Sequence, residues 1–294
     1  MVIPAIPTIA TIVQEGLNKA GLINPPPIKT TRATTQWFEE IKQDIWEAMK
    51  KPVILATTGF FITNPGQVSY NFPSDYSSME SDPEILDGGV YAQAQGGSVN
   101  TIILNAADNS QVTDMIGREV IVYAGTGIGQ INRCIGYDFA TKVATMLQNW
   151  TVSPDATSQY ILVDNTWNLT EEPAFRETSN PIRDYPSKWY SEDGVTSFSI
   201  WPIPYRESNL PWGVRLKYFV NLLTLDEASA LHSLLLQRWR NVFISGIYAK
   251  ALDDMNDDRA EAKLSSYKKQ VVGLGMRENF GDDIGDLQCE VLDY

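Results

Sequence analysis

The sequence predicts an α+β fold: a four-helix bundle formed by N- and C-terminal helix pairs, a long antiparallel β insertion (small barrel or sandwich), and an extended C-terminal arm. Hydrophobic residues recur at helical spacing only towards the two ends of the 294-residue chain. From Pro52 to about Leu225, short apolar runs are separated by Gly, Asn, Asp and Pro, as in antiparallel strands. Because an amphipathic helix pair cannot bury its apolar stripe alone, we expect the outer pairs to pack together.

Two helices are predicted near the N-terminus. Residues 7–20 carry apolar side chains at helical spacing and are followed by a glycine. The stretch "NPPPIK" is expected to be extended, because three prolines cannot enter a helix interior. The second helix is expected to begin at Thr34 or Thr35, with a hydroxyl cap, and to carry Trp37 and Phe38 on its apolar face.

The central part of the chain is predicted to form strands joined by tight turns. The turns come at short intervals, which favours neighbouring antiparallel strands over strands that alternate with helices. The predicted strands are 68–72, 100–104, 118–124, 131–137, 142–147, 158–163, 198–203 and 214–220.

Two further helices are predicted near the C-terminus. The first starts after a capping box at Thr224–Glu227, carries Trp239 and Phe243 on one long apolar stripe, and ends at the polar cluster "DDMNDD". The second is expected to end at Gly273 or Gly275. After it, the sequence predicts an acidic arm whose apolar side chains need a surface to dock on. These are Phe280, Ile284, Leu287, Val291, Leu292 and Tyr294.

Four segments follow from this order of elements. Residues 1–88 are expected to hold the N-terminal helices and first strands of a core, and 89–164 an inserted β module. Residues 165–275 complete the core with strands and the C-terminal helices, and 276–294 form the arm.

Charge argues against nucleic-acid recognition. The formal net charge of the chain is −13. Residues 52–117 contain seven acidic residues and no Lys or Arg, and residues 278–294 contain six acidic residues and no Lys or Arg. A nucleic-acid-binding surface needs a basic stripe to neutralise phosphates. We therefore expect that DNA can pass the protein without specific binding. No apolar run is long enough for a membrane span, and no secretion signal is expected.

The most enzyme-like motif is "AGTGIGQINRC", residues 124–134, which holds Gly125, Gly127 and Gly129. A dinucleotide fingerprint needs a third glycine at a fixed spacing and a helix after it. Gln130 and Asn132 stand at the two positions where that glycine would fall, and the following residues read as another strand. The motif therefore predicts a β-hairpin turn.

Other catalytic chemistry has weak support. The single histidine, His232, lies in a predicted helix, and Cys134 lies in a predicted strand. A pair of carboxylates is a means of catalysis that needs no histidine. A glycan hydrolase therefore stays an alternative function. The candidates are Asp253, Asp254, Asp257, Asp258, Glu171, Glu172, Asp282 and Asp283. We expect no catalytic, cofactor or metal site. Trp37, Phe38, Trp239 and Phe243 are expected to serve helix packing or an interface between copies.

The order of these parts resembles the head-to-tail adaptor (connector) proteins of tailed, especially short-tailed, bacteriophages. The motifs that carry the resemblance lie in 1–88 and 165–294: "WFEEIKQDIWEAMKKP", "VSYNFPSDYSSME", "RDYPSKWYSEDGVTSFSIWPIPY", "GVRLKYFVNLLTL" and "DDRAEAKLSSYKKQ". Residues 111–163 are similar to a small β module inserted in various phage structural proteins.

The resemblance implies a virion structural protein without enzymatic activity, assembled in the host cytoplasm and placed at the head–tail junction. It implies a ring, usually of twelve copies, that joins the portal protein to a tail nozzle or fibre protein while DNA passes through the middle. The arm would reach the portal. The alternatives are another tail component, such as a nozzle or fibre-base protein, or a carboxylate-dependent glycan hydrolase.

Overall fold

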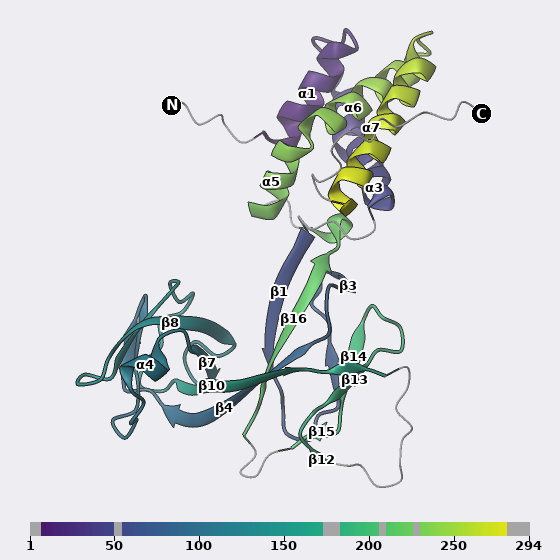
Figure 1. Cartoon of the computed structure of the whole chain (residues 1–294). Coiled ribbons are helices and arrows are strands. Elements are labelled where there is room, and N and C mark those ends of the chain that lie inside the picture. The colour runs from purple at the N-terminus through teal and green to yellow at the C-terminus, as the bar shows by residue number, and fades with distance from the viewer. Residues whose placement is uncertain (1–6, 50–54, 173–182, 206–209, 226–229, 281–294) are drawn as a thin grey trace. The chain divides into compact units, whose positions relative to one another are not determined.

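The computed structural model describes residues 7–49, 55–172, 183–205, 210–225 and 230–280. The chain forms two compact units (Figure 1). The helical unit comprises Met1–Ala56, Ser74–Ser77 and Phe219–Tyr294, and the β unit comprises Thr57–Pro73 and Ser78–Tyr218. Together they give the mixed α+β composition predicted from the sequence.

The N-terminal part of the helical unit contains helix α1 (Ile9–Lys19) and then one continuous helical run. This run consists of α2 (Pro27–Arg32), a π-helical segment η1 (Ala33–Trp37) and α3 (Phe38–Ala48). The side chain of Thr8 caps α1 by accepting a hydrogen bond from the backbone N–H of Thr11 at 3.2 Å.

The predicted start of the second helix at Thr34 or Thr35 is wrong. The helix starts at Pro27, because proline at the first helical position loses no intrahelical hydrogen bond. The hydroxyls of Thr34 and Thr35 donate to the carbonyls of Thr30 and Thr31 inside the helix and cap nothing.

The C-terminal part of the helical unit contains a short 3₁₀ segment and three helices. They are η4 (Leu222–Thr224), α5 (Ala230–Arg238), α6 (Arg240–Asp254) and α7 (Ala260–Phe280). The predicted single stripe is therefore interrupted at Trp239, between α5 and α6.

Helix α7 continues past Gly273 and Gly275 to Phe280, so the predicted helix end is wrong and residues 276–280 are helical. A Cβ atom at Gly275 would lie 2.5 Å from the carbonyl oxygen of Ala48 in α3. This glycine therefore permits close helix packing and does not end the helix.

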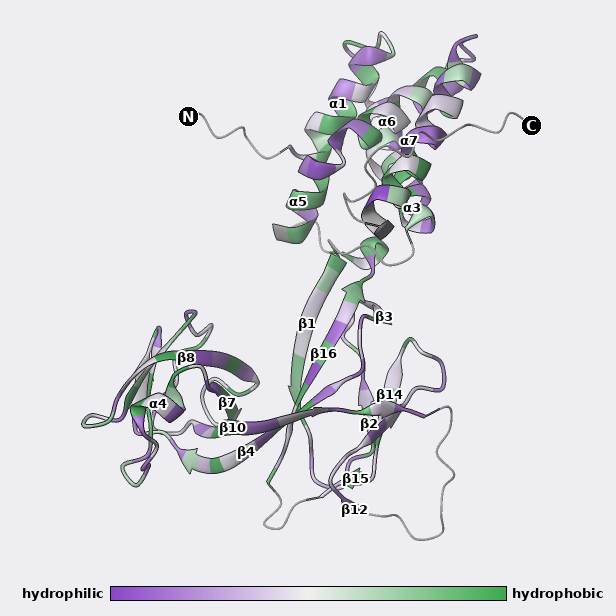
Figure 2. Ribbon diagram, in the orientation of Figure 1, coloured by the Kyte–Doolittle hydropathy of each residue, from purple (hydrophilic) through white to green (hydrophobic). Residues whose placement is uncertain are grey.

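Helices from the two ends of the chain share one hydrophobic core, as the amphipathic patterns predict. Each helix carries both hydrophobic and hydrophilic residues (Figure 2), and the core joins α1 and α3 to α6 and α7. The rings of Phe38 and Phe243 stack in it, with centroids 4.7 Å apart. Since α5 adds Leu235 and Leu236 to the same core, the described helical unit contains more than the four predicted helices.

Two further glycines let these helices approach closely. A Cβ atom at Gly16 in α1 would lie 2.5 Å from Cγ2 of Ile247 in α6. A Cβ atom at Gly246, also in α6, would lie 2.6 Å from Cδ1 of Ile41 in α3. In both cases a backbone without a side chain makes room for a branched side chain from the other end of the sequence.

The β unit is built on a curled, antiparallel half-barrel. Within the described residues, ten strands form one sheet in the order β1-β16-β4-β10-β7-β8-β9-β6-β5, with β3 beside β16. The strands are β1 (Ala56–Ile62), β3 (Tyr76–Met79), β4 (Glu84–Gln93), β5 (Gly96–Ser98), β6 (Thr101–Ile103), β7 (Glu119–Ala124), β8 (Gln130–Asp138), β9 (Val143–Met146), β10 (Gln159–Asn168) and β16 (Gly213–Val220). A single-turn helix α4 (Val112–Met115) precedes β7.

The remaining described strands form two small sheets. One has the order β11-β13-β14-β2 and the other pairs β12 with β15. Their bounds are β2 (Ser69–Asn71), β11 (Thr170–Glu171), β12 (Arg183–Asp184), β13 (Lys188–Tyr190), β14 (Ser197–Trp201) and β15 (Ile203–Pro204).

Each of the eight predicted strands has a counterpart in the structure. The other described strands, β1, β3, β4, β5, β11, β12, β13 and β15, were not predicted. Strand β4 contains Gly88 and Gly89, which break its apolar alternation. A Cβ atom at Gly88 would lie 2.0 Å from Ile161 of β10, where the pairing of the two strands is bulged. The expected module boundaries at 88/89 and 164/165 fall inside β4 and β10.

We predict opposite effects of alanine at two helical glycines. Gly16→Ala should lower the free energy of unfolding of the helical unit by about 1–2 kcal/mol, because the new methyl group overlaps Ile247. Gly273→Ala should raise it by up to about 1 kcal/mol. The added Cβ atom would meet no atom of another element within 4 Å, and alanine favours the helix more than glycine does. Urea unfolding followed by circular dichroism at 222 nm measures both. Equal stabilities would contradict close packing at Gly16.

Candidate functional site

Helix α7 has one face that packs in the core of the helical unit and one that faces outward. Tyr267, Val271 and Leu274 are buried on the inner face. The hydroxyl of Tyr267 donates a 2.8 Å hydrogen bond to Oδ2 of Asp44 in α3. These contacts fix the rotation of α7, and with it the residues that the outer face presents.

The outer face of α7, with the end of α6 and the turn between them, lines an open groove of about 1200 Å³. We call it the α7 groove. Two of its apolar side chains are unusually open to solvent: Val272 is 53% exposed and Met276 is 44% exposed. The described residues that line it are Asp253, Asn256, Asp257, Asp258, Ala260, Glu261, Leu264, Ser265, Lys268, Lys269, Val272, Gly273 and Met276.

The α7 groove has one acidic and one basic section. Its acidic section is formed by the α6–α7 turn and the start of α7, at Asp253, Asp257, Asp258 and Glu261. Lys268 and Lys269 lie two turns further along α7, followed by the apolar Val272 and Met276. The groove therefore presents acidic, basic and apolar sections in order along one helix.

The carboxylates of the α6–α7 turn have structural roles. Asp254 forms ion pairs with Lys29, at 3.1 Å, and with Arg32, at 2.6 Å, which join the end of α6 to α2. The side-chain hydrogen bond from Arg259 lowers the pKa of Asp257 to about 2. A glycosidase general acid needs a raised pKa, so these contacts do not favour the glycan-hydrolase alternative. Glu172 pairs with Lys188, and Asp282 and Asp283 lie outside the described residues.

The two residues considered for nucleophilic catalysis belong to different units. His232 is buried in α5 of the helical unit. Cys134 is buried in β8 of the β unit, and its thiol donates to the carbonyl of Gly136 at 3.2 Å. Burial raises the pKa of the Cys134 thiol, which favours the less reactive protonated form.

The glycine motif forms the turn between β7 and β8, as predicted. Gly125, Gly127 and Gly129 all have positive φ angles, of 76°, 82° and 84°. The backbone N–H of Gly129 donates to the carbonyl of Val122 at 2.8 Å, which closes the hairpin. Strand β8 follows directly, so the helix N-terminus that would bind a phosphate is absent at this turn.

The residues predicted for helix packing or an interface, and those predicted for the arm, differ in where they lie. Trp37, Phe38, Trp239 and Phe243 all lie in the core of the helical unit and have almost no exposed surface. In the arm, Phe280 ends α7, whereas Ile284, Leu287, Val291, Leu292 and Tyr294 lie outside the described residues. Val272 and Met276 were not predicted, although their four-residue spacing marks a second apolar line on α7.

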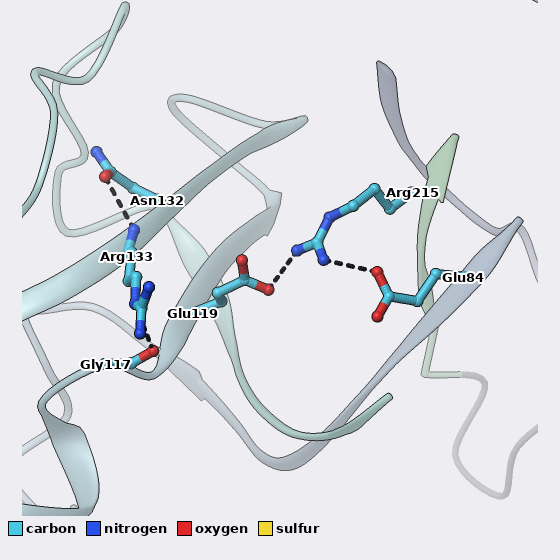
Figure 3. A network of polar contacts seen from close by, with 6 residues as sticks. All are labelled: Glu84, Gly117, Glu119, Asn132, Arg133 and Arg215. Atoms are coloured by element: carbon cyan, nitrogen blue, oxygen red, sulfur yellow. Dashed lines mark hydrogen bonds and ion pairs between the residues drawn. The ribbon is translucent and has the colours of Figure 1, made fainter. Parts of the chain in front are cut away.

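A polar network joins three strands of the β unit (Figure 3). Arg215 in β16 donates to Glu84 in β4 at 2.6 Å and also pairs with Glu119 in β7. In the neighbouring strand β8, Arg133 lies opposite Glu119 and donates from Nε to the carbonyl of Gly117 at 3.0 Å. Since the guanidinium of Arg215 binds a carboxylate on each side, this network stabilises the sheet.

The described part of the chain contains no group of three or more His, Cys, Asp or Glu side chains placed to hold a metal ion. Its helices include none with the length and apolar content that crossing a membrane requires.

Comparison with known protein families gives no matching family, and no curated protein matches the sequence.

We predict that alkaline pH weakens the attachment of α7 through Tyr267. Burial and then the hydrogen bond to Asp44 raise the pKa of this phenol. Its stabilising contribution is therefore complete below the unfolded-state pKa, about 10, and is lost as the pH rises above that value. Tyr267→Phe should cost about 1 kcal/mol at pH 7 and should lose stability less steeply than the wild type above pH 10. Urea unfolding between pH 7 and 11 measures this, and parallel curves would contradict it.

We also predict that Arg215 is needed because it neutralises two carboxylates. Arg215→Met should lower the free energy of unfolding of the β unit by about 2 kcal/mol, since Glu84 and Glu119 lose their shared cation. Adding Glu84→Gln and Glu119→Gln should recover part of this loss. Arg133→Met, which changes an exposed neighbour, serves as the control and should cost less than about 0.5 kcal/mol. Equal losses for the two arginine variants would contradict the assignment.

Proposed function

We propose that the chain is a structural adaptor of a tailed-phage particle. In this proposal it assembles as a ring, joins the portal protein to the tail, and lets DNA pass without specific binding. The proposal includes no catalytic step. The single observation that carries it is the α7 groove, an open apolar and charged surface directly before the predicted arm.

The exposed aliphatic residues of the helical unit support a role in assembly. A closed ring of identical copies needs two different surfaces on each copy, because each copy contacts its neighbours through unlike faces. The outer face of α7 exposes Val272 and Met276. Ile23, between α1 and α2, and Ile28, in the first turn of α2, are 73% and 78% accessible. Exposed aliphatic residues on separate elements are expected of such a subunit.

Charge supports the passage of DNA. With a net charge of −13, the chain repels phosphates at low ionic strength. A channel lined by such subunits would release DNA instead of holding it. The α7 groove as a whole adds no basic stripe to this balance, since its two lysines are outnumbered by its four acidic side chains.

A second candidate is another tail component, such as a nozzle or fibre-base protein. The observation that favours it is a pair of exposed aliphatic side chains on neighbouring strands of the half-barrel. Ile135 in β8 is 51% exposed, and Leu147, directly after β9, is 56% exposed. These two side chains would form a docking surface on the β unit. In the adaptor proposal, a tail protein binds this surface.

The experiment mixes the purified chain with the portal protein of the same phage and measures co-sedimentation by analytical ultracentrifugation. The full chain should sediment with the portal as one ring-sized complex. A chain truncated after Phe280 should keep its circular dichroism spectrum and lose at least about tenfold in portal affinity, since it lacks the arm's aliphatic residues.

The matched control is Ile135→Asp with Leu147→Asp, which alters the β unit and should leave portal binding unchanged. A full chain that stays a monomer in the presence of portal would contradict the adaptor proposal. Loss of portal binding in the control alone would favour the second candidate.

A further inference from the structure

We propose that residues 281–294 bind the α7 groove of their own chain when no partner is present. The segment proposed to bind the portal would then cover the exposed apolar part of its own helix until it is displaced. The inference concerns the free chain, so it can hold or fail whatever the outcome with the portal.

The segment follows the groove directly along the chain. The described structure ends at Phe280, the last residue of α7, and the exposed Met276 and Val272 lie one and two turns before it. A segment that starts at Gly281 meets these two side chains first if it turns back, and glycine permits the positive φ of a sharp reversal.

The apolar pattern of the segment matches the exposed aliphatic residues of α7. Ile284, Leu287 and Val291 follow one another at intervals of three and four residues, which would place them on one face of a helix. If the segment returned along α7, Ile284 would meet Met276, and Leu287 would meet Val272. Burying aliphatic surface against aliphatic surface stabilises such a contact.

The charge of the segment is opposite to that of the basic section of the groove. The segment holds five acidic residues and no Lys or Arg: Asp282, Asp283, Asp286, Glu290 and Asp293. Lys268 and Lys269 are the basic side chains that the groove offers, and both are exposed. Opposite charges therefore face each other once the apolar contacts form. Further along, Glu261 and Asp258 would repel the segment, so it is confined to the apolar and basic sections of the groove.

The segment is long enough to reach the basic section of the groove. The distance along α7 from Phe280 back to Lys268 is about 18 Å at the helical rise per residue. Fourteen residues span about 21 Å as a helix and more when extended, so the segment covers this distance and needs no longer linker.

The experiment uses zero-length carbodiimide cross-linking of the full chain, which joins a lysine amine to a carboxylate only when the two are in contact. The reaction is run on an equal mixture of unlabelled and ¹⁵N-labelled protein, and cross-linked peptides are identified by mass spectrometry. We expect Lys268 or Lys269 joined to Asp286, Glu290 or Asp293, with both peptides of each pair carrying the same isotope.

Variants test whether the apolar contact drives the binding. Val272→Asp with Met276→Asp leaves both lysines in place and should lower the cross-link yield at least about tenfold. Val272→Ser with Met276→Ser, a milder change on the same exposed face, should lower it in the same direction. Ile23→Asp changes a still more exposed aliphatic residue outside α7. It is the control and should leave the yield unchanged.

Each other outcome overturns the inference. Mixed-isotope pairs would mean that the groove binds the segment of a second copy. Absence of these cross-links, or a yield that the Val272 and Met276 variants do not change, would mean that the segment does not dock there. Because no portal is present, none of these results depends on the proposed function.

Discussion

The close approach of the N-terminal helices to the C-terminal helices is the contact on which the rest of the helical unit depends. Gly16 admits Ile247, Gly246 admits Ile41, and the stacked rings of Phe38 and Phe243 fill the space beside them. Segments more than 200 residues apart in sequence thereby bury a common core. This packing also sets the rotation of α7, because Tyr267 and Gly275 hold its inner face against α3. The outer face of α7 is exposed as a consequence.

The sequence predicts those parts of the fold in which one residue pattern has one meaning. Alternating apolar residues predicted strands such as β7 and β10, and three glycines before a further strand predicted the β7–β8 turn. Prediction from the sequence failed where a glycine could either end an element or permit close packing. Gly275 was interpreted as a helix end, although it permits contact with Ala48. Gly88 concealed β4, because the need for its small size arises from Ile161, 73 positions later.

The candidate site was harder to predict for a related reason. Trp37, Phe38, Trp239 and Phe243 have the composition of an interface, yet tertiary packing buries them all. Val272 and Met276 look ordinary in the sequence and become notable only because nothing in the described structure covers them. In a ring-forming adaptor, large aromatic residues would hold the subunit together. Smaller aliphatic residues on an exposed helix would then make the exchangeable contacts with partners.

The most direct test of the adaptor proposal is a cryo-electron microscopy reconstruction of the head–tail junction of a phage particle that contains this chain. The account predicts a closed ring next to the portal, in which each subunit contains the helices α1, α3, α6 and α7 and the curled sheet of the β unit. The C-terminal residues after Phe280 should contact the portal. Finding the chain in a fibre or nozzle, or finding no copy of it at the junction, would contradict the account.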